Sequence, residues 1–196
     1  MSPILQSRAN ASAIGYGAFS VAAAAGDFES IATVTVGSGG AAEIEFASIG
    51  TDWTHLQIRC ITRSETTASY LRIRFNGDTS LNSYTLHQLY GDGSSAGAYA
   101  EASGNSSVGE IILQTTSSHS ANIYAAAIVD ILDYRNANKY KTVRSLNGRD
   151  MNGSGNVLLN STVWLSTSAI TSIKLSQSSG DINEYSHFAL YGIKGA

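Results

Sequence analysis

Two glutamates, Glu43 and Glu45, have a type and spacing that could support catalysis. Residues i and i+2 of a strand lie on the same face, roughly 7 Å apart. Two carboxylates at this separation could act as the acid and base of an inverting glycosidase. Arg59, Arg72 and Arg74 alternate outward in the same way, so cross-strand ion pairs on an exposed face explain these acids more simply. We expect an ion-pair ladder here, with polysaccharide hydrolysis as an alternative.

Residues 150–156, DMNGSGN, resemble the beginning of a calcium-binding loop. Asp150, Asn152 and Ser154 place oxygen atoms at alternate positions, and a glycine follows where such a loop turns. The twelfth position is Ser161, where a calcium loop has a bidentate glutamate. Because the same residue types are typical of a hairpin turn, we expect a turn with no bound metal, and no other cofactor.

The remaining reactive side chains are scattered. The single cysteine, Cys60, alternates with Leu56 and Ile58, which predicts a small buried side chain. The sequence contains no phosphate-binding loop or dinucleotide fingerprint, so we expect no enzymatic activity. The histidines occupy four separate segments without a partner at ligand spacing, which favours surface or interface positions over zinc binding: His55, His87, His119 and His187.

Residues 90–107, YGDGSSAGAYAEASGNSS, are predicted to form a long loop that carries Tyr90 and Tyr99. A rigid tyrosine ring beside small polar groups makes good contact surface, and a structureless loop of this length is uncommon without a role. We predict contact with a glycan or a neighbouring subunit, with a mobile surface loop as the alternative. Tyr84 and Trp164 are further candidates for the same contact.

The elements that must position these side chains are short strands. Charged residues make up 14% of the 196-residue chain, against about 25% in an average domain, and the strong helix formers are scarce. In residues 31–46, IATVTVGSGGAAEIEF, two alternating runs flank a glycine-rich turn, which indicates a hairpin. Similar runs predict strands at 31–36, 42–46, 55–60, 70–76, 83–90, 109–114, 122–132, 140–146, 156–165, 170–176 and 186–194. The alanines of 122–132 also suit a helix, but its β-branched residues and the strand rhythm of the chain favour a strand.

This rhythm predicts an all-β fold, an antiparallel β-sandwich of the jelly-roll type, over residues 28–196. Residues 1–27 are rich in Ala, Ser and Gly without a period, so we expect an extended N-terminal arm that makes assembly contacts. The formal charge is −3 and no long basic run occurs, which disfavours nucleic-acid binding. No apolar run reaches the ~18–20 residues of a membrane span, so we expect no membrane insertion.

Several stretches together resemble a family of tailed-bacteriophage virion proteins found in phages of aquatic bacteria, including cyanobacteria. The resemblance covers most of residues 29–196. It implies a non-enzymatic β-sandwich displayed on the particle as a tail-fibre or capsid-decorating protein, without catalytic residues. It rests on ESIATVTVGSGGAAEIEFASI, THLQIRCITR, LRIRFNGD, IVDILDY, KTVRSLNG and SHFALYGIKGA.

The expected function is therefore that of a virion structural protein, a capsid-decorating or tail-associated subunit. We expect a symmetric oligomer, a homotrimer, tethered by residues 1–27 to other virion proteins such as capsid or tail subunits. The alternative is a receptor-binding tail-fibre module that recognises host surface polysaccharide through the Tyr84, Tyr90, Tyr99 and Trp164 group.

Overall fold

The computed structural model describes residues 26–67, 70–101 and 109–195, and the regular structure in these ranges is β-strand throughout. None of these residues belongs to a helix that could cross a membrane. The strands are β1 (Phe28–Thr35), β2 (Glu43–Phe46), β3 (His55–Thr62), β4 (Tyr70–Phe75), β5 (Tyr84–Gly91), β6 (Ala96–Glu101), β7 (Gly109–Leu113), β8 (Ala125–Ile131), β9 (Lys141–Asp150), β10 (Gly155–Trp164), β11 (Ile173–Ser176) and β12 (His187–Ile193).

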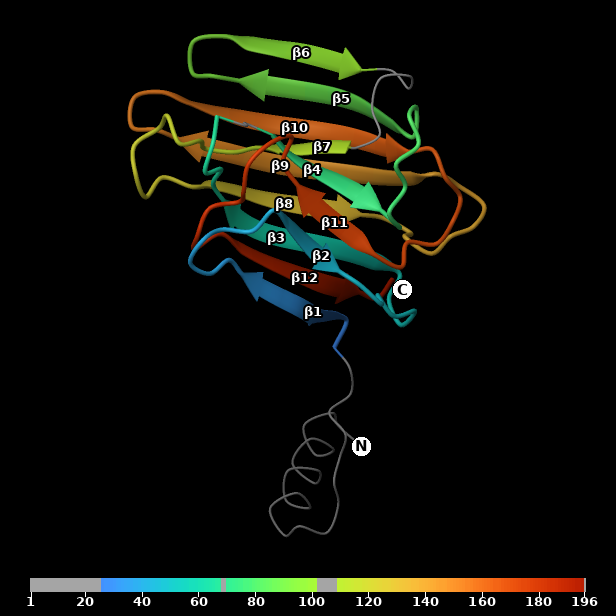
Figure 1. The fold of residues 1–196 in the computed structure, drawn as a ribbon. Helices are drawn as coiled ribbons and strands as arrows, with labels where there is room; N and C mark the ends of the chain where they lie inside the picture. Colours follow the sequence, from blue (N-terminus) through green and yellow to red (C-terminus); the bar gives the residue numbers. More distant parts are fainter. Residues whose placement is uncertain (1–25, 68–69, 102–108, 196) are drawn as a thin grey trace, which may run out of the picture.

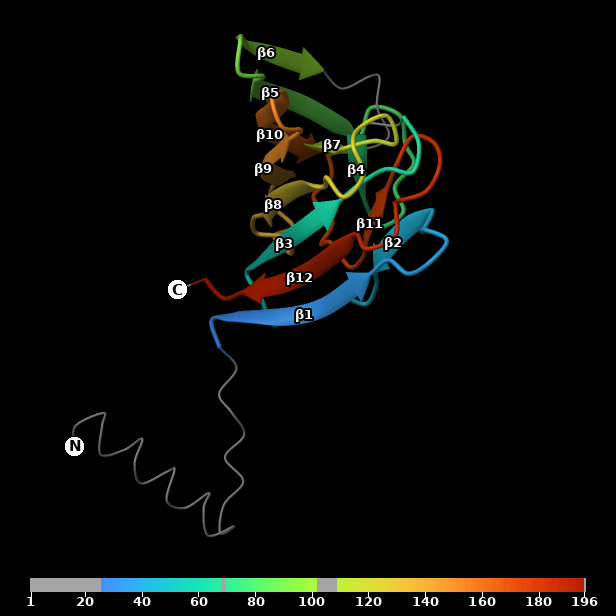
Figure 2. The same cartoon turned by 90° about the vertical axis from the view of Figure 1, so that its left-hand side faces the viewer.

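These strands form two antiparallel sheets that face each other (Figures 1 and 2). The larger sheet has the order β1-β12-β3-β8-β9-β10-β5-β6, and the smaller has the order β2-β11-β4-β7. The predicted all-β antiparallel sandwich is confirmed. Because the larger sheet has four more strands, its β5–β6 end extends past β7, as Figure 2 shows.

Eight strands pass back and forth between the sheets, and two hairpins are added to them. The first eight make the half-sheets β1-β12-β3-β8 and β2-β11-β4-β7. The hairpin β9–β10 joins the larger sheet beside β8, and the hairpin β5–β6 follows beside β10. The added hairpins therefore create the part of the larger sheet that the smaller one does not cover.

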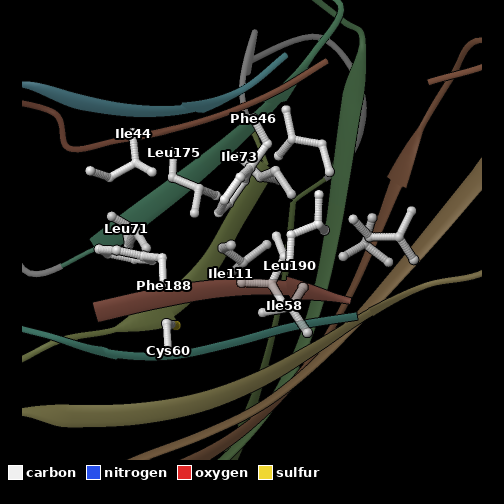
Figure 3. Packing of buried hydrophobic residues seen from close by; sticks show 14 of the residues in the cluster. Ile44, Phe46, Ile58, Cys60, Leu71, Ile73, Ile111, Leu175, Phe188 and Leu190 are labelled. Atoms are coloured by element: carbon white, nitrogen blue, oxygen red, sulfur yellow. The ribbon is translucent and has the colours of Figure 1, made fainter. Parts of the chain in front are cut away.

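The core lies between the sheets, where alternate side chains of each strand point inward. Figure 3 shows side chains of β2, β4 and β11 meeting those of β3 and β12. Cys60 belongs to this core with 8% exposure, as predicted, and burial raises the pKa of its thiol to about 12. The side chains without any exposed surface include Leu56, Ile58, Leu71, Ile73, Phe75, Ile112, Leu175, Phe188 and Leu190.

The hairpin predicted for residues 31–46 is wrong, because β1 and β2 lie in different sheets. The segment between them pairs with the chain before β12 instead: Val36 N–H donates to Ser186 O at 2.8 Å, and Ala41 N–H donates to Ile182 O at 3.0 Å. Each of the two runs has one apolar face. A connection that crosses from one sheet of the sandwich to the other buries these two apolar faces as well as a hairpin within one sheet would. The glycine-rich turn is compatible with either connection.

The predicted loop 90–107 is also partly wrong, because Ala96–Glu101 form β6. The turn before it is made by Asp92, whose Oδ1 accepts the backbone N–H groups of Ser94 and Ser95 at 2.9 and 2.7 Å. Alanine and glycine are weak strand formers, so β6 gives little signal in the sequence. Residues 102–108 and most of the predicted arm 1–27 lie outside the described ranges, and β1 begins at Phe28.

Candidate functional site

The outer face of the larger sheet, turned away from the smaller sheet, carries a row of exposed aliphatic side chains. Outward positions of a water-facing antiparallel sheet are normally polar. Here Ile128, Leu146, Leu159 and Leu89 are direct register neighbours across β8, β9, β10 and β5. Their exposures are 42, 56, 48 and 59%. We call these four residues the aliphatic row.

Further features make this outer face suited to contact with protein. Val157 and Ile61, 61% and 44% exposed, lie in the neighbouring register line. Asp130 and Arg144 are register partners in the line on the other side of the aliphatic row. Two hollows of about 390 and 330 Å³ adjoin the row. The face thus combines exposed leucines, hollows, the Asp130–Arg144 pair and Arg59, which is the register partner of Ile128 in β3.

A second candidate site is a cleft on the inner side of the larger sheet, where β5, β6 and β10 extend past β7. Its volume is about 460 Å³, within the range of small-molecule sites. The walls come from both sheets, so the cleft exists only because the added hairpins widen the larger sheet. It is lined by Tyr70, Gln88, Tyr90, Ala98, Tyr99, Glu110, Leu113, Asn156 and Leu158.

A β-bulge fixes strand β7, one wall of this cleft. The register between β4 and β7 shifts so that Ile111 has no partner in β4, which frees its carbonyl group from the ladder. That carbonyl accepts hydrogen bonds from Ser145, from Asn147 Nδ2 at 3.2 Å and from Asn160 Nδ2 at 3.1 Å. The Leu113 N–H group in turn donates to Asn147 Oδ1 at 3.1 Å. Buried side chains of β9 and β10 therefore hold β7 in place.

The ring of Tyr90 lies across the neighbouring strand. Tyr90 and Gly97 are register partners in β5 and β6, and a Cβ atom on Gly97 would stand 2.5 Å from the Tyr90 hydroxyl oxygen and 2.6 Å from Cζ. The glycine therefore provides the space that the ring occupies. Tyr99, two residues further along β6, has 51% exposure against 38% for Tyr90.

The polar groups of the cleft are already paired in part. Glu110 Oε1 accepts both Nε and Nη2 of Arg72, at 3.3 and 3.1 Å. Asn156 Oδ1 accepts Nε and Nη2 of Arg149, at 3.2 and 3.1 Å. Burial raises the pKa of Tyr70, against the effect of its hydrogen bond with Gln88. The carboxylate of the cleft is therefore neutralised by an adjacent guanidinium group.

The four aromatic residues predicted as contacts separate into two pairs. Tyr90 and Tyr99 line the cleft. Tyr84 and Trp164, 1% and 2% exposed, belong to the core, so their prediction as surface contacts is wrong. Tyr84 accepts the Phe75 N–H at 2.9 Å through its hydroxyl oxygen. Both are the first or last inward residue of a strand, which the alternation pattern places inside.

The predicted ion-pair ladder forms with partners other than those expected. Glu43 and Glu45 both face Lys174 of β11, at 2.7 and 3.6 Å, and the hydrogen bond with Glu43 raises the pKa of Lys174. Arg72 pairs with Glu110. Arg59 lies in the other sheet, with its guanidinium carbon 5.2 Å from the centre of the Phe28 ring and 5.5 Å from that of Tyr191.

The calcium-like residues form the turn between β9 and β10. The Asn152 N–H donates to Asp150 Oδ1 at 2.9 Å, and the Met151 N–H donates to Ser154 O at 2.8 Å. The histidines stay apart: Nδ1 of His55 accepts the Asp133 N–H, and Nδ1 of His119 accepts the Thr116 N–H. Within the described ranges, no three His, Cys, Asp or Glu residues are grouped as metal ligands.

The sequence interpretation missed the aliphatic row and most of the cleft. A signal for the row was present in the consecutive aliphatic residues of VLL (157–159) and IV (128–129), because such runs place apolar groups on both faces of a strand. Gln88 and Glu110 belong to different sheets and gave no such signal. No protein-family model, curated protein or solved structure matches the chain at a significant level.

Proposed function

We propose that the chain is a non-enzymatic structural protein of a virus particle, a capsid-decorating or tail-associated subunit that assembles as a symmetric homo-oligomer. The observation that carries the assembly part of this proposal is the aliphatic row on the outer face of the larger sheet. Four register-aligned aliphatic side chains, each more than 40% exposed, form the kind of patch that marks a protein–protein interface.

The occupant of this face is a second copy of the chain. Asp130 and Arg144 lie side by side along one flank of the aliphatic row, so the flank carries both a negative and a positive group. When two copies meet through a two-fold axis, each contact is made twice, with the roles of the two residues exchanged. Such a contact joins copies in pairs, so we propose it in place of the homotrimer expected from the sequence. A flank with both charges is complementary to itself in that arrangement, while the leucines of each copy enter the hollows of the other.

The strand order supports a jelly roll within the sandwich. The half-sheets β1-β12-β3-β8 and β2-β11-β4-β7 have the order of two interleaved Greek keys, with the hairpins β5–β6 and β9–β10 as additions. Jelly rolls are common in viral capsid and lectin domains. This support is an analogy between folds, because one fold serves many functions.

Residues 1–27 act in this proposal as a tether to neighbouring capsid or tail subunits. The support is compositional: a segment rich in Ala, Ser and Gly without a period gains order from contact with a partner surface. The tether role stays a prediction.

The experiment is to purify particles of the virus that encodes the chain, and to detect the protein in them by mass spectrometry and by immunogold electron microscopy. We expect the protein to copurify with particles in a fixed ratio to the major capsid protein, with gold at a regular position on the capsid or tail. Its absence from gradient-purified particles, with presence in the infected-cell extract, would contradict the proposal.

A further inference from the structure

We propose that the cleft between β5–β6–β10 and β7 is a binding site for a neutral saccharide. The two features that carry this inference are its two exposed tyrosines and its polar groups, which are amides and one carboxylate paired with Arg72. The inference goes beyond a structural role, because it gives each subunit a ligand of its own.

The tyrosines supply the flat surface that a sugar ring needs. The apolar C–H face of a pyranose packs on aromatic rings, and a tyrosine provides that surface with little loss of side-chain entropy. Tyr90 is held flat over Gly97, while Tyr99 stands beside it on β6 with half of its surface exposed. The platform is thus formed before a ligand arrives, which lowers the free-energy cost of binding.

The polar groups supply donors and acceptors for hydroxyl groups. Both bonds from Arg72 end on Glu110 Oε1, so the second oxygen, Oε2, is not engaged by that arginine. Arg149 holds Asn156 by its Oδ1 atom, which makes the amide nitrogen the group that can serve a ligand. Gln88, only 7% exposed, adds a second amide group to the lining.

The charge of the cleft selects the class of saccharide. Among the described residues that line the cleft, only Glu110 has an ionised side chain, and Arg72 neutralises it, with Nη2 at 3.1 Å from Oε1. Arg149, the other guanidinium group nearby, is not a lining residue and donates to Asn156 Oδ1 and Gln114 O. An acidic sugar would therefore bring its carboxylate toward Glu110 without a lining cation to meet it, which is unfavourable. A neutral mono- or disaccharide fits the cleft volume of about 460 Å³ and meets no such repulsion.

The test is a titration of the full-length protein with maltose, cellobiose, lactose and chitobiose, with sialyllactose as the acidic probe, followed by saturation-transfer NMR. We expect millimolar binding of at least one neutral disaccharide, and weaker binding of sialyllactose. Tyr99→Ala should weaken the binding at least about tenfold. The matched control Tyr140→Ala, which removes a ring of 54% exposure beyond the other end of β9, should leave it unchanged.

A second variant tests whether binding depends on the position of the Tyr90 ring, because it moves this ring without removing it. Gly97→Val keeps every lining side chain but places a Cβ where the Tyr90 ring now lies, so it should also weaken binding. Thermal unfolding of each variant checks that the fold is retained. Failure of all four neutral disaccharides to bind at millimolar concentration, equal binding after Tyr99→Ala, or preference for sialyllactose overturns the inference.

Discussion

Asn160 of β10 reaches across the sandwich and donates its side-chain amide to the backbone carbonyl of Ile111 in β7, at 3.1 Å. The bulge at Ile111 is the reason that this carbonyl is available, since it has no ladder partner in β4. A buried carbonyl needs a donor, and here three side chains of the opposite sheet provide it. A polar contact between the sheets therefore fixes the position of β7 relative to β9 and β10. Because β7 forms one wall of the cleft, the same contact fixes that wall.

The first prediction concerns Asn147, which both donates to Ile111 O and accepts the Leu113 N–H. Asn147→Leu leaves that buried N–H group without a partner, so we expect a loss of about 2 kcal/mol in the free energy of unfolding. Ser145→Ala is the matched control, because Ile111 O keeps two donors, and its cost should stay below about 1 kcal/mol. Urea denaturation measures both. Equal losses for the two variants would contradict the role assigned to the Leu113 bond.

The second prediction concerns acid stability. Burial raises the pKa of Asp78, but hydrogen bonds from Trp164 Nε1 and from the Ser80 N–H outweigh it and lower the pKa from 3.8 to about 2. A carboxyl group whose pKa is lower in the folded protein than in the unfolded chain stabilises the fold at pH values above the unfolded-state pKa. This stabilisation is lost as the pH falls from about 4 toward 2.

Asp78→Asn tests this assignment, because an asparagine has one oxygen where the carboxylate uses two. The variant should be less stable than the native protein at pH 7, and the difference should shrink as the pH approaches the folded-state pKa of about 2. Urea unfolding followed by tryptophan fluorescence at several pH values gives the comparison. A difference that does not change with pH would show that the charge of Asp78 is not involved.

The third prediction concerns Cys60. Its thiol is 8% exposed, and burial raises its pKa to about 12, so at pH 8 it carries almost no reactive thiolate. We expect no reaction of the folded protein with Ellman's reagent over an hour, and stoichiometric reaction in 6 M guanidinium. Rapid reaction of the native protein would mean that the core between β3 and β12 opens readily.

The sequence predicts which residues form strands better than it predicts which strands pair with each other. The sequence pattern located eleven of the strands because most of them have one face more buried than the other, as in YLRIRF of β4, whose burial alternates along its whole length. It did not reveal whether β1 pairs with β2, because that depends on Ser186 and Ile182, about 140 residues away. Pairing is set by long-range contacts, which a local period does not report.

For the candidate sites, too, the local sequence indicates single residues but not the long-range contacts that bring them together. Tyr90 and Tyr99 were found because they stand out in a stretch of small residues. Glu110 joins them only because the Ile111 bulge and the added β5–β6 hairpin bring β7 beside the end of the larger sheet. Aromatic character alone predicts surface contact wrongly for Tyr84 and Trp164, because the register of their strands turns both side chains into the core.

The most direct test of the proposed assembly is the molar mass of the full-length protein in solution, by light scattering on a sizing column, for three proteins. If the aliphatic row joins two copies, the native chain is an oligomer and the double variant Leu146→Lys/Leu159→Lys is a folded monomer. The matched variant Leu81→Lys, at a leucine that is 71% exposed outside the row, stays oligomeric. A native protein that is monomeric at about 100 μM, or a double variant with the native mass, would contradict the account.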